Sequence, residues 1–311
     1  MLLPLVPQRA GQRQPVRHLR ILDAIDEPQS VSLSIRSFLL HDPLLIGGVA
    51  AAVLAGTSVL LGVPVDGPLL GAGFCGTALV YGADRRVGRS PEDLVNRPER
   101  VTWVRRHRGW LRGEAIGLAV GLALLIPLLQ RQTLWAAAVP AALALLHLAP
   151  VLPGARRLKA IGSAKSLLVA LGWAFGATLL PVMEATGPVP SLPAIAWTGA
   201  YRFVLVLPNI VLADWGDREG DRRAGLQTWT TPWQRVDVQR GLSILLVAGF
   251  MGVGLAVVSF GAPEILLLDA CVLVIMLLAV WRLRPGEEPL HALLLDLVVA
   301  WPVVNLITLL G

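Results

Sequence analysis

Three aspartates within LADWGDREGDRRAGLQT, residues 212–228, have a spacing that suits metal chemistry. Asp214, Asp217 and Asp221 fall at positions i, i+3 and i+7, so a helix would place all three on one face. Like charges at this spacing repel one another, and a divalent cation would relieve the repulsion. Because the stretch contains no His or Cys, its ligands are oxygen atoms alone, which favours Mg²⁺ with water and phosphate completing the shell.

A simpler interpretation of the same stretch is that ordinary helix ion pairs neutralise it. Arg218, Arg222 and Arg223 alternate with the aspartates and would supply such pairs on a solvated face. Gly216 and Gly220, however, place no side chain between the carboxylates and would let another backbone or a ligand approach closely. The glycines favour a binding site, and the ion-pair interpretation stays open.

Long apolar segments must hold these side chains in place. The chain has 311 residues, is 55% hydrophobic and 15% charged, and has a mean hydropathy of +0.65, which exceeds the needs of a soluble core. A spanning helix needs roughly 20 mostly apolar residues. Such segments occupy residues 38–62, 67–83, 111–129, 134–152, 164–183, 192–213, 241–260, 264–281 and 290–310. The sequence predicts an all-α fold, an integral membrane bundle of nine transmembrane helices.

The first residues of the chain differ from the apolar remainder. Residues 1–36 carry five arginines and predict a basic cytoplasmic N-terminal arm, ahead of a transmembrane domain formed by residues 37–311. Part of the arm, around Val16 to Ile25, would suit a helix lying in the membrane interface. A disordered arm fits the same composition, and both alternatives stay open.

The basic residues predict how the segments are oriented in the membrane. With the N-terminus inside, 25 of the 27 arginines and lysines are cytoplasmic, while Arg131 falls in an outer loop and Arg202 within a span. This asymmetry predicts a multi-pass protein of the cell membrane whose C-terminus lies on the opposite side from its N-terminus. Because most arginines flank apolar segments, orientation accounts for the net charge of +6, and nucleic-acid binding is not expected.

The acidic stretch resembles the second aspartate-rich motif of the UbiA superfamily of intramembrane prenyltransferases, DxxDxxxD followed by Gly and Thr. Its matching residues are Asp214, Asp217, Asp221, Gly225 and Thr228. A second resemblance lies in LKAIGSAKSLLVALGW, residues 158–173, which is similar to the basic motif before the fifth helix of that family. The two lysines of the chain, Lys159 and Lys165, both occur there and suit a phosphate as compact point charges. Snorkelling of both lysines at a membrane end is the alternative.

The first motif of the family, NxxxDxxxD followed by NxPxR, is matched only in its second half by residues 81–100. The residues that keep the spacing are Asp93, Asn96, Pro98 and Arg100. The leading Asn is absent, and Asp84 precedes Asp93 by nine residues instead of four. Ser90, Pro91 and Asp93 also spell a helix start, so Asp93 could be a capping residue. The neighbouring Arg85 and Arg86 offer an ion-pair explanation for Asp84.

The resemblance implies a Mg²⁺-dependent transfer of an isoprenoid chain from an allylic diphosphate to an acceptor at the cytoplasmic face. The residues expected to hold metal are Asp84, Asp93, Asp214, Asp217 and Asp221. Those expected to bind diphosphate are Asn96, Arg100, Lys159, Lys165 and Arg222, and Asp217, Asp221 and Lys165 would be catalytic. The partners are an isoprenoid diphosphate, a small aromatic or lipid acceptor and the membrane lipids. Alternatives are a membrane terpene cyclase, a transporter and a non-catalytic family member.

Three ionisable residues fall within the predicted spans, where charge is expensive and often functional. Arg202 would lie about 15 Å into its helix, at 1.5 Å per residue from Leu192. Asp296, on the inner half of the last span, could pair with Arg202 or line a cavity, whereas Asp269 suggests a structural role nearer the outer face. For Arg202, a structural pair and a role in the pocket both stay open.

The charge asymmetry and the odd number of spans predict that the two ends of the chain lie on opposite sides of the membrane. A reporter that works only in the cytoplasm should be active when fused to the N-terminus and inactive when fused after Gly311. Activity at both ends would contradict nine spans.

Overall fold

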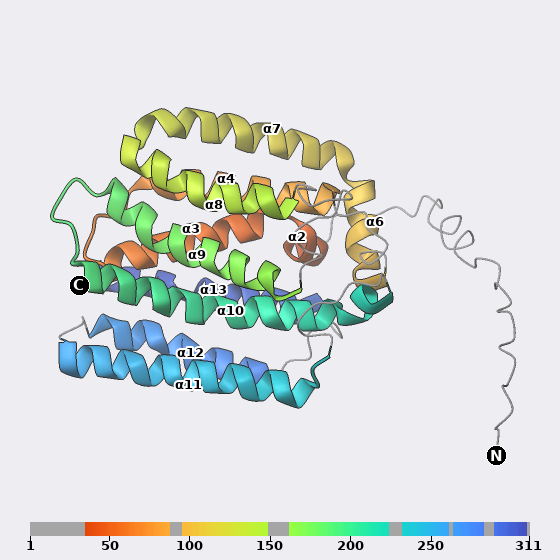
Figure 1. Ribbon diagram of the computed structural model, residues 1–311. Coiled ribbons are helices and arrows are strands. Elements are labelled where there is room, and N and C mark those ends of the chain that lie inside the picture. The colour runs from red at the N-terminus through yellow and green to blue at the C-terminus, as the bar shows by residue number, and fades with distance from the viewer. Residues whose placement is uncertain are drawn as a thin grey trace, which may run out of the picture. The chain divides into compact units, whose positions relative to one another are not determined.

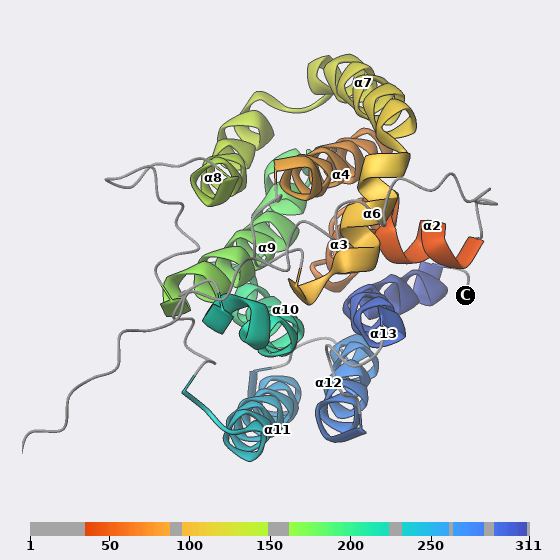
Figure 2. The same cartoon turned by 90° about the vertical axis from the view of Figure 1, so that its right-hand side faces the viewer.

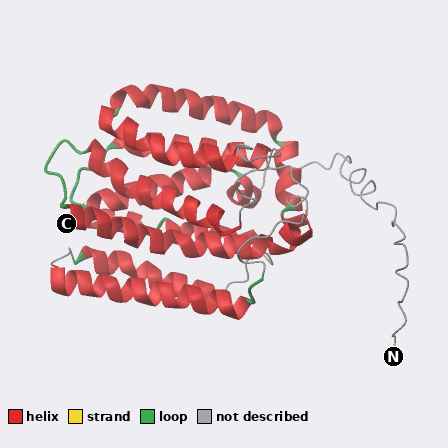
Figure 3. Ribbon diagram, in the orientation of Figure 1, coloured by secondary structure: helices red, strands yellow, loops and turns green. Residues whose placement is uncertain are grey.

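The computed structural model describes residues 35–87, 95–148, 162–223, 232–260, 264–282 and 289–309. Every regular element within these ranges is a helix, and none is a strand. In hydrocarbon, backbone polar groups can be satisfied only inside a helix or a closed barrel, so long apolar segments become helices. The all-α class predicted from the sequence is confirmed (Figure 3).

The helices follow the predicted apolar segments in order (Figure 1). They are α2 (Ile35–His41), α3 (Leu44–Leu60), α4 (Gly67–Val87), α6 (Pro98–Arg106), α7 (Arg108–Leu125), η1 (Ile126–Leu128), α8 (Arg131–Leu148), α9 (Gly162–Glu184), α10 (Leu192–Arg223), α11 (Arg235–Phe260), α12 (Ile265–Arg282), α13 (Pro289–Val299) and η3 (Trp301–Leu309). The short helix α6, which the sequence did not predict, separates α4 from α7.

The number of spans is smaller than predicted when length and apolarity are applied as criteria. Within the described ranges, six helices are long and apolar enough to cross a membrane, and a seventh is possible if α2 and α3, bent by 64°, form one span. The helices α4 and α8 coincide with predicted spans but do not meet these criteria. Nine spans are therefore not confirmed, although each predicted segment is mainly helical over the residues that the structure describes.

Local chemistry sets the two ends of α3. Asp42 accepts a hydrogen bond at its Oδ1 from the backbone N–H of Leu44 at 3.0 Å, and Pro43 stands between them at the N-cap. At the other end, Gly62 adopts a φ of +67°, a left-handed conformation that favours glycine and ends helices. These residues turn the chain toward α4, which packs against α3.

The long helix α10 occupies the middle of the bundle. It packs against α9, α11, α12 and α13, and half of its most apolar stretch is buried, against 11% for the span that contains α7. Viewed along the helices, α7 and α8 lie at the outside (Figure 2). In Figure 1, α6 runs across the end of the bundle where α7 begins and α10 ends.

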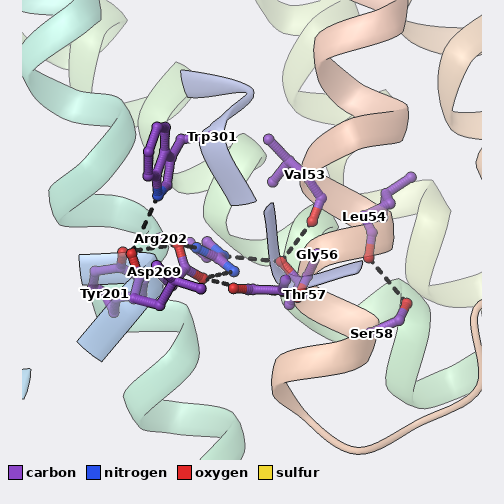
Figure 4. Close-up of polar contacts among 11 residues, drawn as sticks. Val53, Leu54, Gly56, Thr57, Ser58, Tyr201, Arg202, Asp269 and Trp301 are labelled. Atoms are coloured by element: carbon purple, nitrogen blue, oxygen red, sulfur yellow. Dashed lines mark hydrogen bonds and ion pairs between the residues drawn. The ribbon is translucent and has the colours of Figure 1, made fainter. Parts of the chain in front are cut away.

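A buried network of polar side chains joins four helices in the interior (Figure 4). Arg202 of α10 donates to both carboxylate oxygens of Asp269 of α12, at 3.1 and 2.7 Å, and its Nε donates to the Thr57 hydroxyl of α3 at 2.9 Å. Tyr201 and Asn305 donate to the same carboxylate at 3.1 and 2.9 Å. Both members of the ion pair are fully buried. A buried pair of this kind is tolerated in hydrocarbon because both carboxylate oxygens accept two hydrogen bonds each and all three guanidinium nitrogens donate one.

This network settles the partner of Arg202. The carboxylate that it contacts is Asp269, so the structural role expected for Asp269 agrees with the geometry. Asp296, which the sequence offered as another partner for Arg202, instead accepts a hydrogen bond from Asn209 at 3.1 Å. The packing of the helices, and not the position of the residues along the chain, determines which carboxylate pairs with Arg202.

Removing one partner of the network should destabilise the bundle strongly. Asp269→Ala leaves the guanidinium of Arg202 buried and unpaired, and we expect the free energy of unfolding to fall by about 3–5 kcal/mol. Unfolding in detergent, followed by circular dichroism, measures this loss. The double variant Arg202→Met/Asp269→Leu should recover most of it, because it buries no charge. A double variant as unstable as Asp269→Ala would contradict the role of the charge.

Candidate functional site

The acidic residues lie on the last turns of α10, where the helix emerges from the apolar bundle. Its 32 residues span about 48 Å, whereas the hydrocarbon core is about 30 Å thick. Because α10 continues unbroken to Arg223, Asp214, Asp217 and Asp221 share one helical face as predicted. Asp214 and Asp221 are buried, and Asp217 is partly exposed.

Asn96 attaches the segment before α6 to this part of α10. Its Nδ2 donates to the backbone carbonyl of Asp217 at 2.7 Å, and its Oδ1 accepts from the backbone N–H of Gly220 at 2.8 Å. A Cβ atom on Gly220 would overlap the amide of Asn96, so only glycine leaves room for this contact. We call this two-point contact the Asn96 clamp. It brings the second half of the first motif directly against the second motif.

Arg97, the next residue, supplies a positive charge to the acidic stripe. Its Nε lies 3.0 Å from Oδ1 of Asp217, and the two side chains are 25% and 29% exposed. The pair is thus open to solvent, where salt screens it and its net stabilisation is small. An exposed pair of this kind can exchange partners when a phosphate or a cation approaches.

The start of α9 lies on the other side of the stripe. Ser166, fully buried, donates a hydrogen bond to Oδ2 of Asp214. Lys165 directly precedes Ser166 in α9, so it is within the basic motif that α9 contacts the acidic motif. Nothing further is described for the side chain of Lys165, and Lys159 lies outside the described residues.

The ion-pair interpretation paired the three arginines of the stripe with its aspartates, but the structure gives these arginines other partners. Arg222 and Arg223 approach the carboxylate of Glu219 at 3.7 and 3.0 Å, and the guanidinium of Arg218 stacks on the ring of Trp215 at 3.6 Å. These contacts account for the three arginines without the aspartates.

The remaining predicted site residues are only partly brought together. Asp84 is partly buried in the last turn of α4, and Arg100 is partly buried in α6, whereas Arg222 is exposed. Asp93, with Gly225 and Thr228, lies outside the described residues. Among the residues that the structure describes, no three His, Cys, Asp or Glu side chains are grouped closely enough to hold a metal ion.

Sequence reasoning missed several polar residues around the site. Arg97 and Ser166 were within the quoted motifs but had no assigned role. Arg85 donates to the backbone carbonyl of His41 and lies within electrostatic range of Arg100 and Asp296. The pair Arg85–Arg86 at the end of an apolar segment was the available signal for a cationic group at this end of the bundle.

Comparison with solved structures reveals the fold. A UbiA homologue from Archaeoglobus fulgidus, bound to DMAPP and Mg²⁺, matches with a TM-score of 0.57 at 15% sequence identity, over 86% of this chain and 98% of that chain. The apo structure of a UbiA homologue from Aeropyrum pernix K1 matches with a TM-score of 0.56 at 14% identity, over 90% and 100%. This chain has the UbiA fold. No protein-family model and no curated protein matches the sequence. Because the sequence identity to the two solved neighbours is low, the fold is the property that this chain shares with them.

The UbiA fold agrees with the resemblance seen in the sequence. In both solved neighbours the match covers nearly the whole neighbouring chain. Asn96 of the first motif and Ser166 of α9 both contact the second motif, at the end of the bundle where α10 ends. This end of the bundle is the candidate active site.

The Asn96 clamp predicts that substitution of Gly220 lowers the stability of the protein. Gly220→Ala should lower the free energy of unfolding by about 1–3 kcal/mol, because the added methyl group overlaps the amide of Asn96. Gly254→Ala, a helical glycine of α11 with open space around it, should be neutral or slightly stabilising. Thermal unfolding of both variants measures the difference. Adding Asn96→Ala should relieve the Gly220→Ala loss, and strictly additive losses would contradict the clamp.

Proposed function

We propose that this chain is a Mg²⁺-dependent intramembrane prenyltransferase of the UbiA superfamily. The observation that carries the proposal is the Asn96 clamp, which holds the second half of the first motif against the second motif in a bundle with the UbiA fold. A solved neighbour with this fold binds DMAPP and Mg²⁺. We infer that an isoprenoid diphosphate binds at the end of the bundle formed by α6, α9 and α10.

The residues present fit a magnesium ion that relies on its substrate. Asp214, Asp217 and Asp221 offer only hard oxygen donors on one face of α10. Mg²⁺ commonly takes one or two carboxylates and fills its remaining positions with water and phosphate oxygens. Asp84 or Asp93 would complete the site from the first motif. When bound, Mg²⁺ stabilises the negative charge on the departing diphosphate.

The chain itself supplies fixed positive charge where the diphosphate would gain negative charge. Arg97 already lies at the stripe, and Arg100 follows one turn later in α6. Lys165, Lys159 and Arg222 are proposed to add to this group. Charges held in place before the reaction stabilise the leaving diphosphate without reorganising during the step. Asn96 acts by positioning α10, because its amide is engaged with the backbone of that helix.

The apolar interior behind the stripe suits the hydrocarbon part of the substrate. The bundle would exclude water from the allylic cation, and an acceptor, aromatic or lipid, would attack the cation carbon. A terpene cyclase would use the same diphosphate site without an acceptor, and the products distinguish the two. The active site is proposed to face the cytoplasm, following the arginine asymmetry.

A transporter is less consistent with the interior charges. Arg202 and Asp269, which could have been groups of an ion pathway, are fully buried and hydrogen-bonded to each other. Such a pair has no contact with water along a path. A non-catalytic member of the superfamily would keep the fold and lose diphosphate release, and the experiment below distinguishes that outcome.

The acidic stripe should control Mg²⁺-dependent release of diphosphate. Asp217→Asn and Asp221→Asn should each lower the rate by about two orders of magnitude or more, the scale of losing one preorganised electrostatic group. Purified protein is supplied with Mg²⁺, isoprenoid diphosphates of several chain lengths and a mixed panel of acceptors. Release of diphosphate is measured, and mass spectrometry identifies the products.

Glu219→Gln is the matched control on the same helix. Glu219 is exposed and pairs with Arg222 and Arg223, away from the stripe. It should keep most of the wild-type rate. If both aspartate variants also keep it, the proposed metal role of the stripe is wrong, and wild-type protein that releases no diphosphate from any substrate would favour a non-catalytic role.

A further inference from the structure

A small hollow of about 110 Å³ lies where α4, α6 and α7 meet, and no residue of the proposed active site lines it. Val104 and Leu111 are buried and form its apolar floor. Arg86, Arg108 and Arg112 form the rest of its lining. Because a water molecule needs only about 10–15 Å³ of such volume, the hollow has room for a group of several heavy atoms, such as a phosphate.

The side chains of three arginines line this hollow. Arg108 and Arg112 are exposed and stand one turn apart on α7, where like charges repel. Arg86 donates its Nε to a backbone carbonyl of α4 at 2.8 Å, which holds its guanidinium against that helix. Glu114 of α7 lies within electrostatic range of Arg86. Within the described part of the chain, no ion pair joins a carboxylate to these three arginines.

An exposed apolar row continues from the two arginines along α7. Ile116, Val120 and Leu124 follow Arg108 and Arg112 at intervals of four residues and are 66%, 53% and 69% exposed. From Arg112 to Leu124 the row extends about 18 Å. Half of the hydrocarbon core is about 15 Å thick. The row is therefore long enough to follow one acyl chain from the headgroup region to the middle of the bilayer.

We propose that the hollow binds the phosphate headgroup of an anionic phospholipid, with an acyl chain along the exposed row of α7. Arginine forks match phosphate oxygens in pairs, and basic pockets between transmembrane helices suit anionic headgroups. A soluble phosphate would use the arginines but leave the apolar row without a role. The site is independent of the proposed prenyl transfer, because it shares no residue with the acidic stripe.

Lipid retention by the purified protein tests this site. The full chain is placed in nanodiscs that contain equal amounts of phosphatidylcholine and phosphatidylglycerol, released into detergent, and weighed by native mass spectrometry. The wild-type protein should keep phosphatidylglycerol in preference to phosphatidylcholine. Arg108→Gln/Arg112→Gln should lose about 25-fold of that preference, since one basic residue near anionic lipid contributes roughly fivefold.

The control has the same charge as the test variant. Arg105→Gln/Arg106→Gln removes two arginines from the end of α6 that do not line the hollow, and it should keep the wild-type preference. An equal loss in both double variants would overturn the site in favour of general attraction to basic residues. Binding of inorganic phosphate to the protein with no preference for phosphatidylglycerol over phosphatidylcholine would show a soluble-anion site and would also overturn the proposal.

Discussion

Hydrocarbon offers no hydrogen-bonding partner, so every polar group inside the bundle must find its partner within the protein. The guanidinium of Arg202 is the most demanding case, because it is fully buried and carries a full charge. Its contacts with Asp269 and Thr57 connect α10 to α12 and α3, and Asn305 adds η3 through the same carboxylate. The position of the central helix is thus determined at Arg202, deep in the bundle.

The fixed position of α10 at Arg202 also defines where the other end of the same helix lies. From Arg202 to Asp217, α10 rises about 22 Å without a break. A helix held firmly at one point presents its far end at a defined place, where Asn96 and Ser166 contact it from two sides. The polar residues that stabilise the fold and those of the candidate site are therefore at separate places along α10. The ion pair lies deep in the bundle, and the acidic face lies where the helix emerges.

Much of this architecture could be predicted because bilayers require long apolar segments, and these segments are visible in the sequence. The shared face of Asp214, Asp217 and Asp221 followed from spacing alone, since α10 is continuous.

The helix α6 could not be predicted, because it is polar and gains its order from Trp103 and Val104 packing on Leu111. Arg97 stands at an unspecified position of the NxPxR pattern, and only proximity reveals its contact with Asp217. Pairings such as Asn209 with Asp296 depend on which helices become neighbours.

The Asn96 clamp also has a consequence for the order in which the molecule is made. Its two partners are separated by 121 residues of chain. Ribosomes add about 5–20 residues per second, so Asp217 is synthesised roughly 6–24 s after Asn96. During that interval the polar segment around Asn96 must wait at the membrane surface while several apolar helices are inserted after it. The candidate active site is thus among the last features to form during biogenesis, and a nascent chain that stops before α10 ends has no such site to expose.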